Sequence, residues 1–186
     1  DLAATREAPV GSFLGVPLRL SDGTLYGTLC GASHAPDNTL GERDVRFMSM
    51  LAELIVQDLD AERLQEQLRA DLMRVLEAES LSIAYQPIID LHGDQCLGFE
   101  ALARFPKPFS KPDLTLAAAD TVGLRLGLER LAIRQAWKML ALLGPGQFLA
   151  VNVSPDALVG LARRANLRDD LPLAKLVVEV TEHAAV

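Results

Sequence analysis

The chain of 186 residues is 49% apolar and 23% charged, a composition typical of globular proteins and not of disordered or collagen-like chains. Its formal net charge of −7 disfavours nonspecific binding to a nucleic-acid polymer, because such binding relies on clustered Lys and Arg. No stretch approaches the length of about 18 uncharged apolar residues that a membrane helix needs, and residues 1–10 lack the pattern of a secretion signal. We therefore expect a cytoplasmic protein that binds neither a membrane nor a nucleic-acid polymer.

The first predicted element is an antiparallel hairpin over residues 12–33. Two β-like runs, SFLGVPLRL and LYGTLCGAS, are separated by the turn-forming triplet SDG. A lone hairpin needs further strands or a helix to cover its apolar face. Nothing before this hairpin supplies them, so we expect the chain to begin inside a domain.

A long amphipathic helix is predicted over residues 42–79. From Val45 to Val75 apolar residues recur mostly three or four positions apart, and no Pro or Gly interrupts them. We expect the first half of the helix to pack on its own domain. The second half carries dense charge around a narrow Leu stripe, which is typical of a dimeric coiled coil, so it predicts a homodimer.

After Ser80 predicted strands and helices alternate. Four runs read as strands: SIAYQPII, QCLGFEALARF, QFLAVNVS and AKLVVEVTE. Helices are predicted over about residues 115–143 and 155–164. This spacing predicts an α/β fold with a parallel sheet, whereas the short link LHGD makes the first two strands a hairpin at the entrance to the fold.

Polar residues interrupt three of these strands where burial is expected: Glu100 and Arg104, then Asn152, then Glu179 and Glu182. In parallel α/β folds ligands gather at the carboxyl ends of the strands. Glu100, Asn152 and Glu179 supply the carboxylate and amide oxygens that a hard divalent cation prefers. Arg104 shares a face with Glu100, and its planar fork is suited to a phosphate.

Each of these positions also has a structural interpretation. Glu100 and Arg104 can form a simple salt bridge, and Asn152 can be a cap or turn residue at the end of its strand. Glu179 and Glu182 can lie on a solvated edge or in the first turn of a helix. The coincidence of all three interruptions favours a ligand site.

Four segments, in order, resemble the first half of an EAL domain, the bacterial cyclic di-GMP phosphodiesterase. They are YQPIIDL (85–91), GFEALAR (98–104), VNVS (151–154) and VEVTE (178–182). The resemblance implies a partial (β/α)8 barrel of the TIM type. It also implies hydrolysis of cyclic di-GMP to linear pGpG with Mg²⁺ or Mn²⁺ as cofactor.

The resemblance assigns roles to individual residues. The implied metal ligands are Glu100, Asn152 and Glu179, and the implied substrate contacts are Gln86 and Arg104. Glu100 is also a catalytic position.

A second catalytic position falls on Glu182, where the family's glutamate orders a neighbouring loop and helps to couple it to dimerisation. The chain stops before the aspartate pair and the lysine of the family, so we expect it to be inactive by itself. The alternative is an inactive EAL-type receptor that binds cyclic di-GMP without cutting it.

The amino-terminal segments GVPLRLSDGTLYGTLCGAS and GERDVRFMSMLAELI resemble the last strands and the closing helix of a GAF sensory domain. Such domains bind small molecules, and the sequence does not identify this ligand. We therefore expect an α+β GAF-like fragment over residues 1–62, a connecting helix over 63–79, and the first part of an EAL domain over 80–186. The sensor would regulate the enzyme through the helix.

Overall fold

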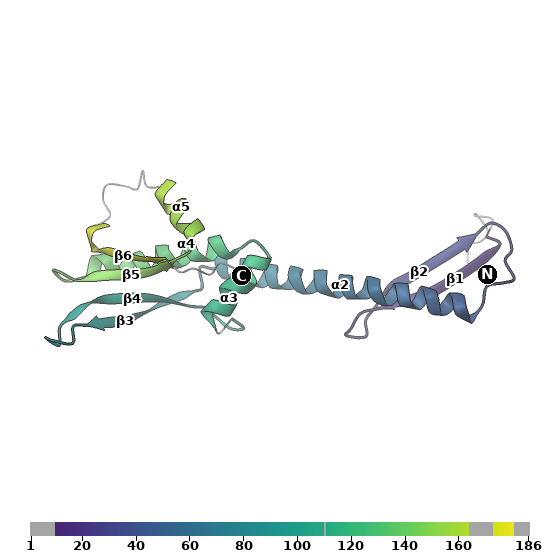
Figure 1. The fold of residues 1–186 in the computed structure, drawn as a ribbon, viewed down its shortest axis with the longest axis horizontal. Helices are drawn as coiled ribbons and strands as arrows, with labels where there is room; N and C mark the ends of the chain where they lie inside the picture. Colours follow the sequence, from purple (N-terminus) through teal and green to yellow (C-terminus); the bar gives the residue numbers. More distant parts are fainter. Residues whose placement is uncertain (1–9, 110, 164–172, 181–186) are drawn as a thin grey trace. The chain divides into compact units, whose positions relative to one another are not determined.

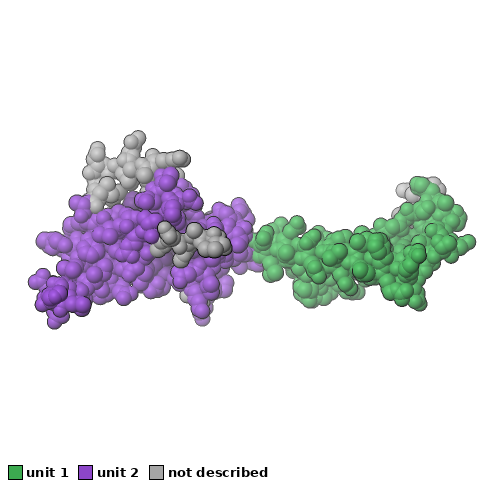
Figure 2. Space-filling view, viewed as in Figure 1, with its two compact units in different colours: residues 1–66 green, residues 67–186 purple. Residues whose placement is uncertain are grey.

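The structure is a computed structural model that describes residues 10–109, 111–163 and 173–180. The chain divides into two compact units, residues 1–66 and residues 67–186 (Figure 2). Helix α2 (Glu42–Glu77) supplies residues to both units. Each unit has a core of its own.

The first unit contains the predicted hairpin. Strand β1 (Ser12–Arg19) pairs with β2 (Leu25–Ser33) in an antiparallel ladder. Burial alternates along β1, so one face of the hairpin turns toward α2 and the other toward solvent. The first half of α2 covers the buried face, as predicted; the cluster consists of Val16, Leu18 and Ala52 with Leu29, Met48 and Val56.

Asp22 holds the turn between these two strands. Its Oδ1 accepts a hydrogen bond of 2.9 Å from the backbone N–H of Thr24, and its Oδ2 lies 2.9 Å from Nη1 of Arg63 on α2. Hydrogen bonds from Thr24, and then the Arg63 guanidinium, lower the pKa of Asp22. The turn is thereby tied to the helix that covers the hairpin.

The second unit is built on a four-stranded sheet in the order β3-β4-β5-β6 (Figure 1). Its strands are β3 (Ser82–Ile89), β4 (Cys96–Arg104), β5 (Phe148–Val153) and β6 (Leu176–Val180). Strands β3 and β4 form an antiparallel hairpin, and β4, β5 and β6 run parallel. The structure confirms all four predicted strands and their α/β arrangement.

Helical segments connect the parallel strands. Between β4 and β5 lie α3 (Pro112–Thr121), α4 (Arg125–Ala136) and the 3₁₀ helix η1 (Trp137–Leu142). Between β5 and β6 lie α5 (Pro155–Arg163) and the short 3₁₀ helix η2 (Leu173–Lys175). One face of the sheet packs on these helices through the buried side chains of Ala101, Ile133, Ala136, Leu140, Leu143, Leu149, Val151, Val153 and Ala157.

The prediction of one helix over residues 115–143 is wrong, because the chain turns at Gly123. Gly123 has φ of +70°, a left-handed conformation that glycine adopts without a Cβ penalty. The N–H of Leu124 then reaches back to the carbonyl of Ala119 at 2.8 Å, which ends α3 and starts α4 in a new direction. A glycine inside a helical pattern was the available signal.

The coiled-coil interpretation is wrong for the last part of α2. Leu72 is fully buried and Val75 is 5% exposed, and both belong to the core of the second unit. Apolar side chains of α3 and α4 supply the partners that the sequence pattern had suggested a second chain would provide. The strongly exposed apolar side chains of α2 lie in its first two thirds and include Phe47, Met50, Leu54 and Leu64.

A close approach of backbones pins β4 to β5. A Cβ placed on Gly98 would lie 2.3 Å from the carbonyl oxygen of Phe148. We expect Gly98→Ala to lower the free energy of unfolding by about 1–3 kcal/mol, because the strand must move to make room. Urea unfolding followed by circular dichroism measures this loss.

Gly127→Ala is the matched control. Its added Cβ would meet only the flexible end of Leu76 at 3.4 Å, and a helical Gly→Ala change is expected to add about 0.5–1 kcal/mol. Equal stability of the two variants would contradict the close packing of β4 on β5.

Candidate functional site

Four polar side chains line up across the sheet of the second unit. Gln86 pairs with Glu100 across β3 and β4, and Asn152 pairs with Glu179 across β5 and β6. Residues that pair directly in neighbouring strands project from the same face of a sheet. Nδ2 of Asn152 donates a hydrogen bond of 2.9 Å to Oε1 of Glu100, which joins the two pairs. We call these four residues the polar row.

The alternation of side chains along the strands keeps the polar row away from the core. Ala101, Val151 and Val153 alternate with its members and are buried against the helices on the other face. Glu100 is half-buried, while Gln86, Asn152 and Glu179 are exposed. The predicted metal ligands therefore share one accessible face.

The carboxylates of the polar row have no ion-pair partner among the residues that the structure describes. Arg104 is exposed, and its Nη1 donates to the carbonyl of the adjacent Ala103 at 3.0 Å. No salt bridge joins it to Glu100, so that interpretation is wrong. The negative charge of Glu100 and Glu179 is left uncompensated on this face.

The donor set of the polar row fits a divalent cation. It offers two carboxylates and one amide carbonyl, and hard cations prefer such oxygen ligands. The amide nitrogen of Asn152 is hydrogen-bonded to Glu100, which leaves Oδ1 of Asn152 available as a ligand. Within the described ranges no three His, Cys, Asp or Glu side chains gather as a metal site, so this set depends on Asn152. Glu182 lies outside the described residues.

Comparison with known proteins assigns the chain to a family. Residues 65–186 match the family model of the EAL domain, and residues 1–59 match that of the GAF domain. The chain belongs to the EAL family. The four-stranded sheet and its helices are accordingly part of the TIM-type barrel of EAL domains.

Among curated relatives, the bifunctional diguanylate cyclase/cyclic di-GMP phosphodiesterase MucR of Pseudomonas aeruginosa is 31% identical over 134 residues, 66% of this chain and 20% of MucR. The diguanylate cyclase DgcP of Escherichia coli is 41% identical over 69 residues, 37% of this chain and 20% of DgcP. The chain thus spans about a fifth of the length of these relatives.

Among the residues that the structure describes, no helix combines the length and the hydropathy that a membrane span requires.

A solved EAL structure supports the fold. The PaMucR phosphodiesterase in complex with c-di-GMP superposes with a TM-score of 0.53 at 30% identity, covering 62% of this chain and 52% of that chain.

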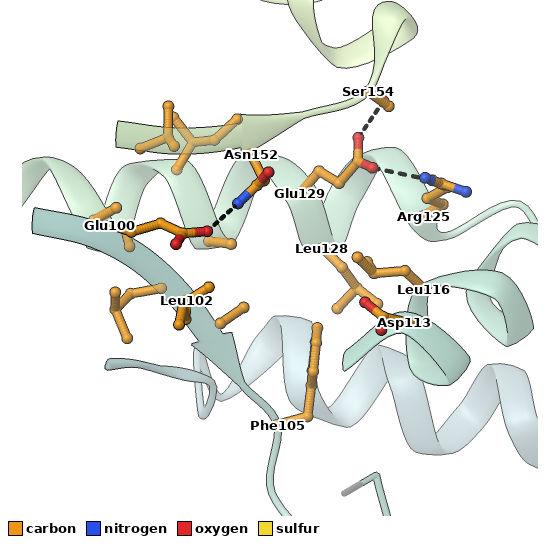
Figure 3. Close-up of a pocket in the computed structure, with 17 residues that line it drawn as sticks. Glu100, Leu102, Phe105, Asp113, Leu116, Arg125, Leu128, Glu129, Asn152 and Ser154 are labelled. Carbon is orange, nitrogen blue, oxygen red and sulfur yellow. Dashed lines mark hydrogen bonds and ion pairs between the residues drawn. The ribbon is translucent and has the colours of Figure 1, made fainter. Parts of the chain in front are cut away.

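In this EAL domain a cavity of about 320 Å³ opens at the carboxyl ends of β4 and β5 (Figure 3). Glu100 and Asn152 of the polar row line one part of it, and Phe105 and Leu128 contribute to an apolar part. The cavity lies at the end of the sheet where ligands of α/β folds bind.

A buried cluster that the sequence analysis missed lines the same cavity: Arg125, Glu129 and Ser154 (Figure 3). Glu129 on α4 is only 7% exposed. Its Oε1 accepts a hydrogen bond of 3.0 Å from Nε of Arg125, and its Oε2 accepts one of 2.5 Å from the hydroxyl of Ser154. The opposite charges of Arg125 and Glu129, four residues apart within one predicted helix, were the signal for the first contact.

This cluster predicts an asymmetry in stability. Glu129→Leu leaves the Arg125 guanidinium without its buried partner, so we expect the free energy of unfolding to fall by about 3–5 kcal/mol. Replacing both residues by Leu should cost less than the single change, because no unpaired charge is then buried. Chemical denaturation of the three proteins measures both values.

The exposed pair of Arg134 with Glu79 provides the control. Its side chains are 60% and 50% exposed, so Arg134→Ala is expected to cost at most about 1 kcal/mol. If Glu129→Leu cost no more than Arg134→Ala, the buried character of the cluster would be refuted.

Proposed function

We propose that this chain is part of a regulated, metal-dependent phosphodiesterase that hydrolyses cyclic di-GMP to linear pGpG. The observation that carries the proposal is the polar row, in which Glu100, Asn152 and Glu179 present oxygen ligands from three neighbouring strands on one face. Membership of the EAL family and the phosphodiesterase names of its relatives support the reaction and its substrate.

The metal ion would be Mg²⁺ or Mn²⁺, held by Glu100, Asn152 and Glu179. When bound, such an ion lowers the pKa of a coordinated water and offsets charge that develops on the phosphate. The hydrogen bond from Asn152 fixes Glu100 before any ligand arrives, which reduces the reorganisation that binding requires.

The remaining residues of the proposed site would bind and order the substrate. Gln86, at the end of the polar row, would contact the dinucleotide. Arg104 uses one N–H toward a backbone carbonyl and keeps the rest of its fork for a phosphate oxygen. Glu182 would order the loop beside the site.

The match of residues 1–59 to the GAF domain supports regulation. In this proposal the GAF part binds a small molecule that the residues described do not identify. The division into a GAF-like part (1–62), a connecting helix (63–79) and an EAL part (80–186) belongs to the same proposal. A cytoplasmic location is also part of it.

Hydrolysis by the full-length protein that contains this chain tests the proposal. With Mg²⁺ or Mn²⁺ it should convert cyclic di-GMP to pGpG, and Glu100→Ala should lower the rate by more than about 100-fold, since even changes behind the metal ligands cost 10- to 100-fold. Product analysis by liquid chromatography gives the rates, and circular dichroism checks that the variant folds.

Glu77→Ala, which removes an exposed carboxylate at the end of α2, should leave the rate unchanged and serves as control. Unmodified protein that binds cyclic di-GMP in calorimetry but yields no pGpG would instead be a receptor. Unchanged turnover by Glu100→Ala would exclude Glu100 as a metal ligand.

A homodimer is a further part of the proposal, now through the first two thirds of α2. Phe47, Met50, Leu54 and Leu64 fall on the a and d positions of a heptad and are 60–71% exposed. The proposed partner is a second copy of the chain, because a heptad stripe pairs with an equal stripe.

Sedimentation velocity of the full-length protein tests this interface. We expect a dimer that Leu54→Glu converts to monomer, because two carboxylates would be buried against each other. Ala70→Glu adds the same charge at an exposed position off the stripe and should leave the dimer intact. Dimers of both variants would show that this stripe is not the interface.

A further inference from the structure

We propose that Glu129 is a positioning residue: through Ser154 it fixes the carboxyl end of β5, and thereby holds Asn152 in the polar row. The inference rests on the proposed metal site, because Asn152 is one of the ligands that it would align. It concerns a residue that lies on helix α4 and not on any strand of the sheet.

Ser154 is the link between helix and strand. It directly follows β5 and stands two residues after Asn152. Its hydroxyl donates to Oε2 of Glu129 at 2.5 Å and accepts the backbone N–H of Ala157 at 3.2 Å. A hydroxyl has one proton to donate, so these two bonds together select one orientation of the side chain. The end of β5 and the first turn of α5 are thereby attached to α4.

Glu129 is a rigid anchor for this link. Arg125, one turn earlier on α4, donates to the other carboxylate oxygen at 3.0 Å; the side chain of Arg125 is 16% exposed and that of Glu129 is 7% exposed. The helix is itself fixed by Leu128 and Leu131, which are 0% and 3% exposed in the core. Both oxygens of Glu129 are therefore occupied, and the carboxylate has little freedom to rotate (Figure 3).

Asn152 depends on this anchor because its own side chain has few restraints. It is exposed, and the hydrogen bond to Glu100 is the one side-chain hydrogen bond that the described residues give it. Its direction is set by the backbone of β5, whose next residue, Val153, is 1% exposed in the core. Ser154 follows Val153 directly, so a displacement at Ser154 would act on the end of the strand that sets the direction of Asn152.

The cost of the cluster argues for positioning over stability. A buried ion pair loses much of its attraction to desolvation, and apolar replacements are often at least as stable. A fully satisfied polar network instead fixes one arrangement of its members. Here the network includes Ser154, which stands two residues after the proposed metal ligand Asn152.

Direct binding of Mn²⁺ to the full-length protein, followed by the electron paramagnetic resonance signal of the free ion, tests the inference. Ser154→Ala should raise the Mn²⁺ dissociation constant by about tenfold, the low end of the effect of residues that orient metal ligands. Ser154→Thr keeps the hydroxyl and should stay within about twofold of the unmodified protein.

Two further variants separate positioning from loss of stability. The double change Arg125→Leu with Glu129→Leu removes the anchor but keeps the hydrogen bond from the Ala157 N–H to the Ser154 hydroxyl at the start of α5. It should weaken Mn²⁺ binding as Ser154→Ala does. Leu140→Ala destabilises the core of the same unit and should leave Mn²⁺ affinity unchanged.

The inference is overturned if Ser154→Ala and the double variant bind Mn²⁺ like Leu140→Ala. It is also overturned if the unmodified protein shows no Mn²⁺ binding that Glu100→Ala abolishes. Failure of the proposed function has a different signature: Mn²⁺ binds and depends on Ser154, yet no pGpG is formed.

Discussion

The pairing register of β3 to β6 is the constraint on which the proposed site depends. Because side chains alternate along a strand, a slip of one residue would turn Glu100 toward the helices and Ala101 toward solvent. The apolar face opposes such a slip, since it would bury charge and expose the core. The close approach of Gly98 to Phe148 adds a steric restraint between β4 and β5. The packing of the opposite face therefore decides which side of the sheet carries the polar row.

The sequence predicted what depends on local periodicity. Alternation with a period of two identified the strands and placed Glu100, Asn152 and Glu179 at corresponding points, and the structure brings these residues onto one face. Sequence periodicity did not predict features that are determined by a tertiary contact or by a single backbone angle. The left-handed Gly123 divides one predicted helix, and the burial of Leu72 in the chain's own core resembles a coiled-coil stripe in sequence. Periodicity shows that a face is apolar and not what covers it.

Helix α4 shows why the link from Glu129 to Ser154 could not be predicted. Its residues Leu128 and Leu131 belong to the same apolar cluster as Leu72 of α2, while Glu129 between them points to the end of β5. A charge that interrupts an apolar helix usually faces solvent. Only the connection of α4 to β5 shows that this carboxylate has a buried donor 25 residues further along the chain.

The carboxylates of the second unit lie in two kinds of environment, and the environment of each indicates its role. Glu129 is buried with both oxygens hydrogen-bonded, and its charge is paired with that of Arg125. Glu100 and Glu179 stand on the accessible face with no cation beside them among the described residues, and Arg104 is turned to a backbone carbonyl. Glu100 and Glu179 lie on the two strands that flank β5, so a cation bound at Asn152 would be attracted by the negative charge on either side. A carboxylate whose charge is paired and hydrogen-bonded is suited to holding structure in place, and two carboxylates without a counter-charge are suited to binding an ion.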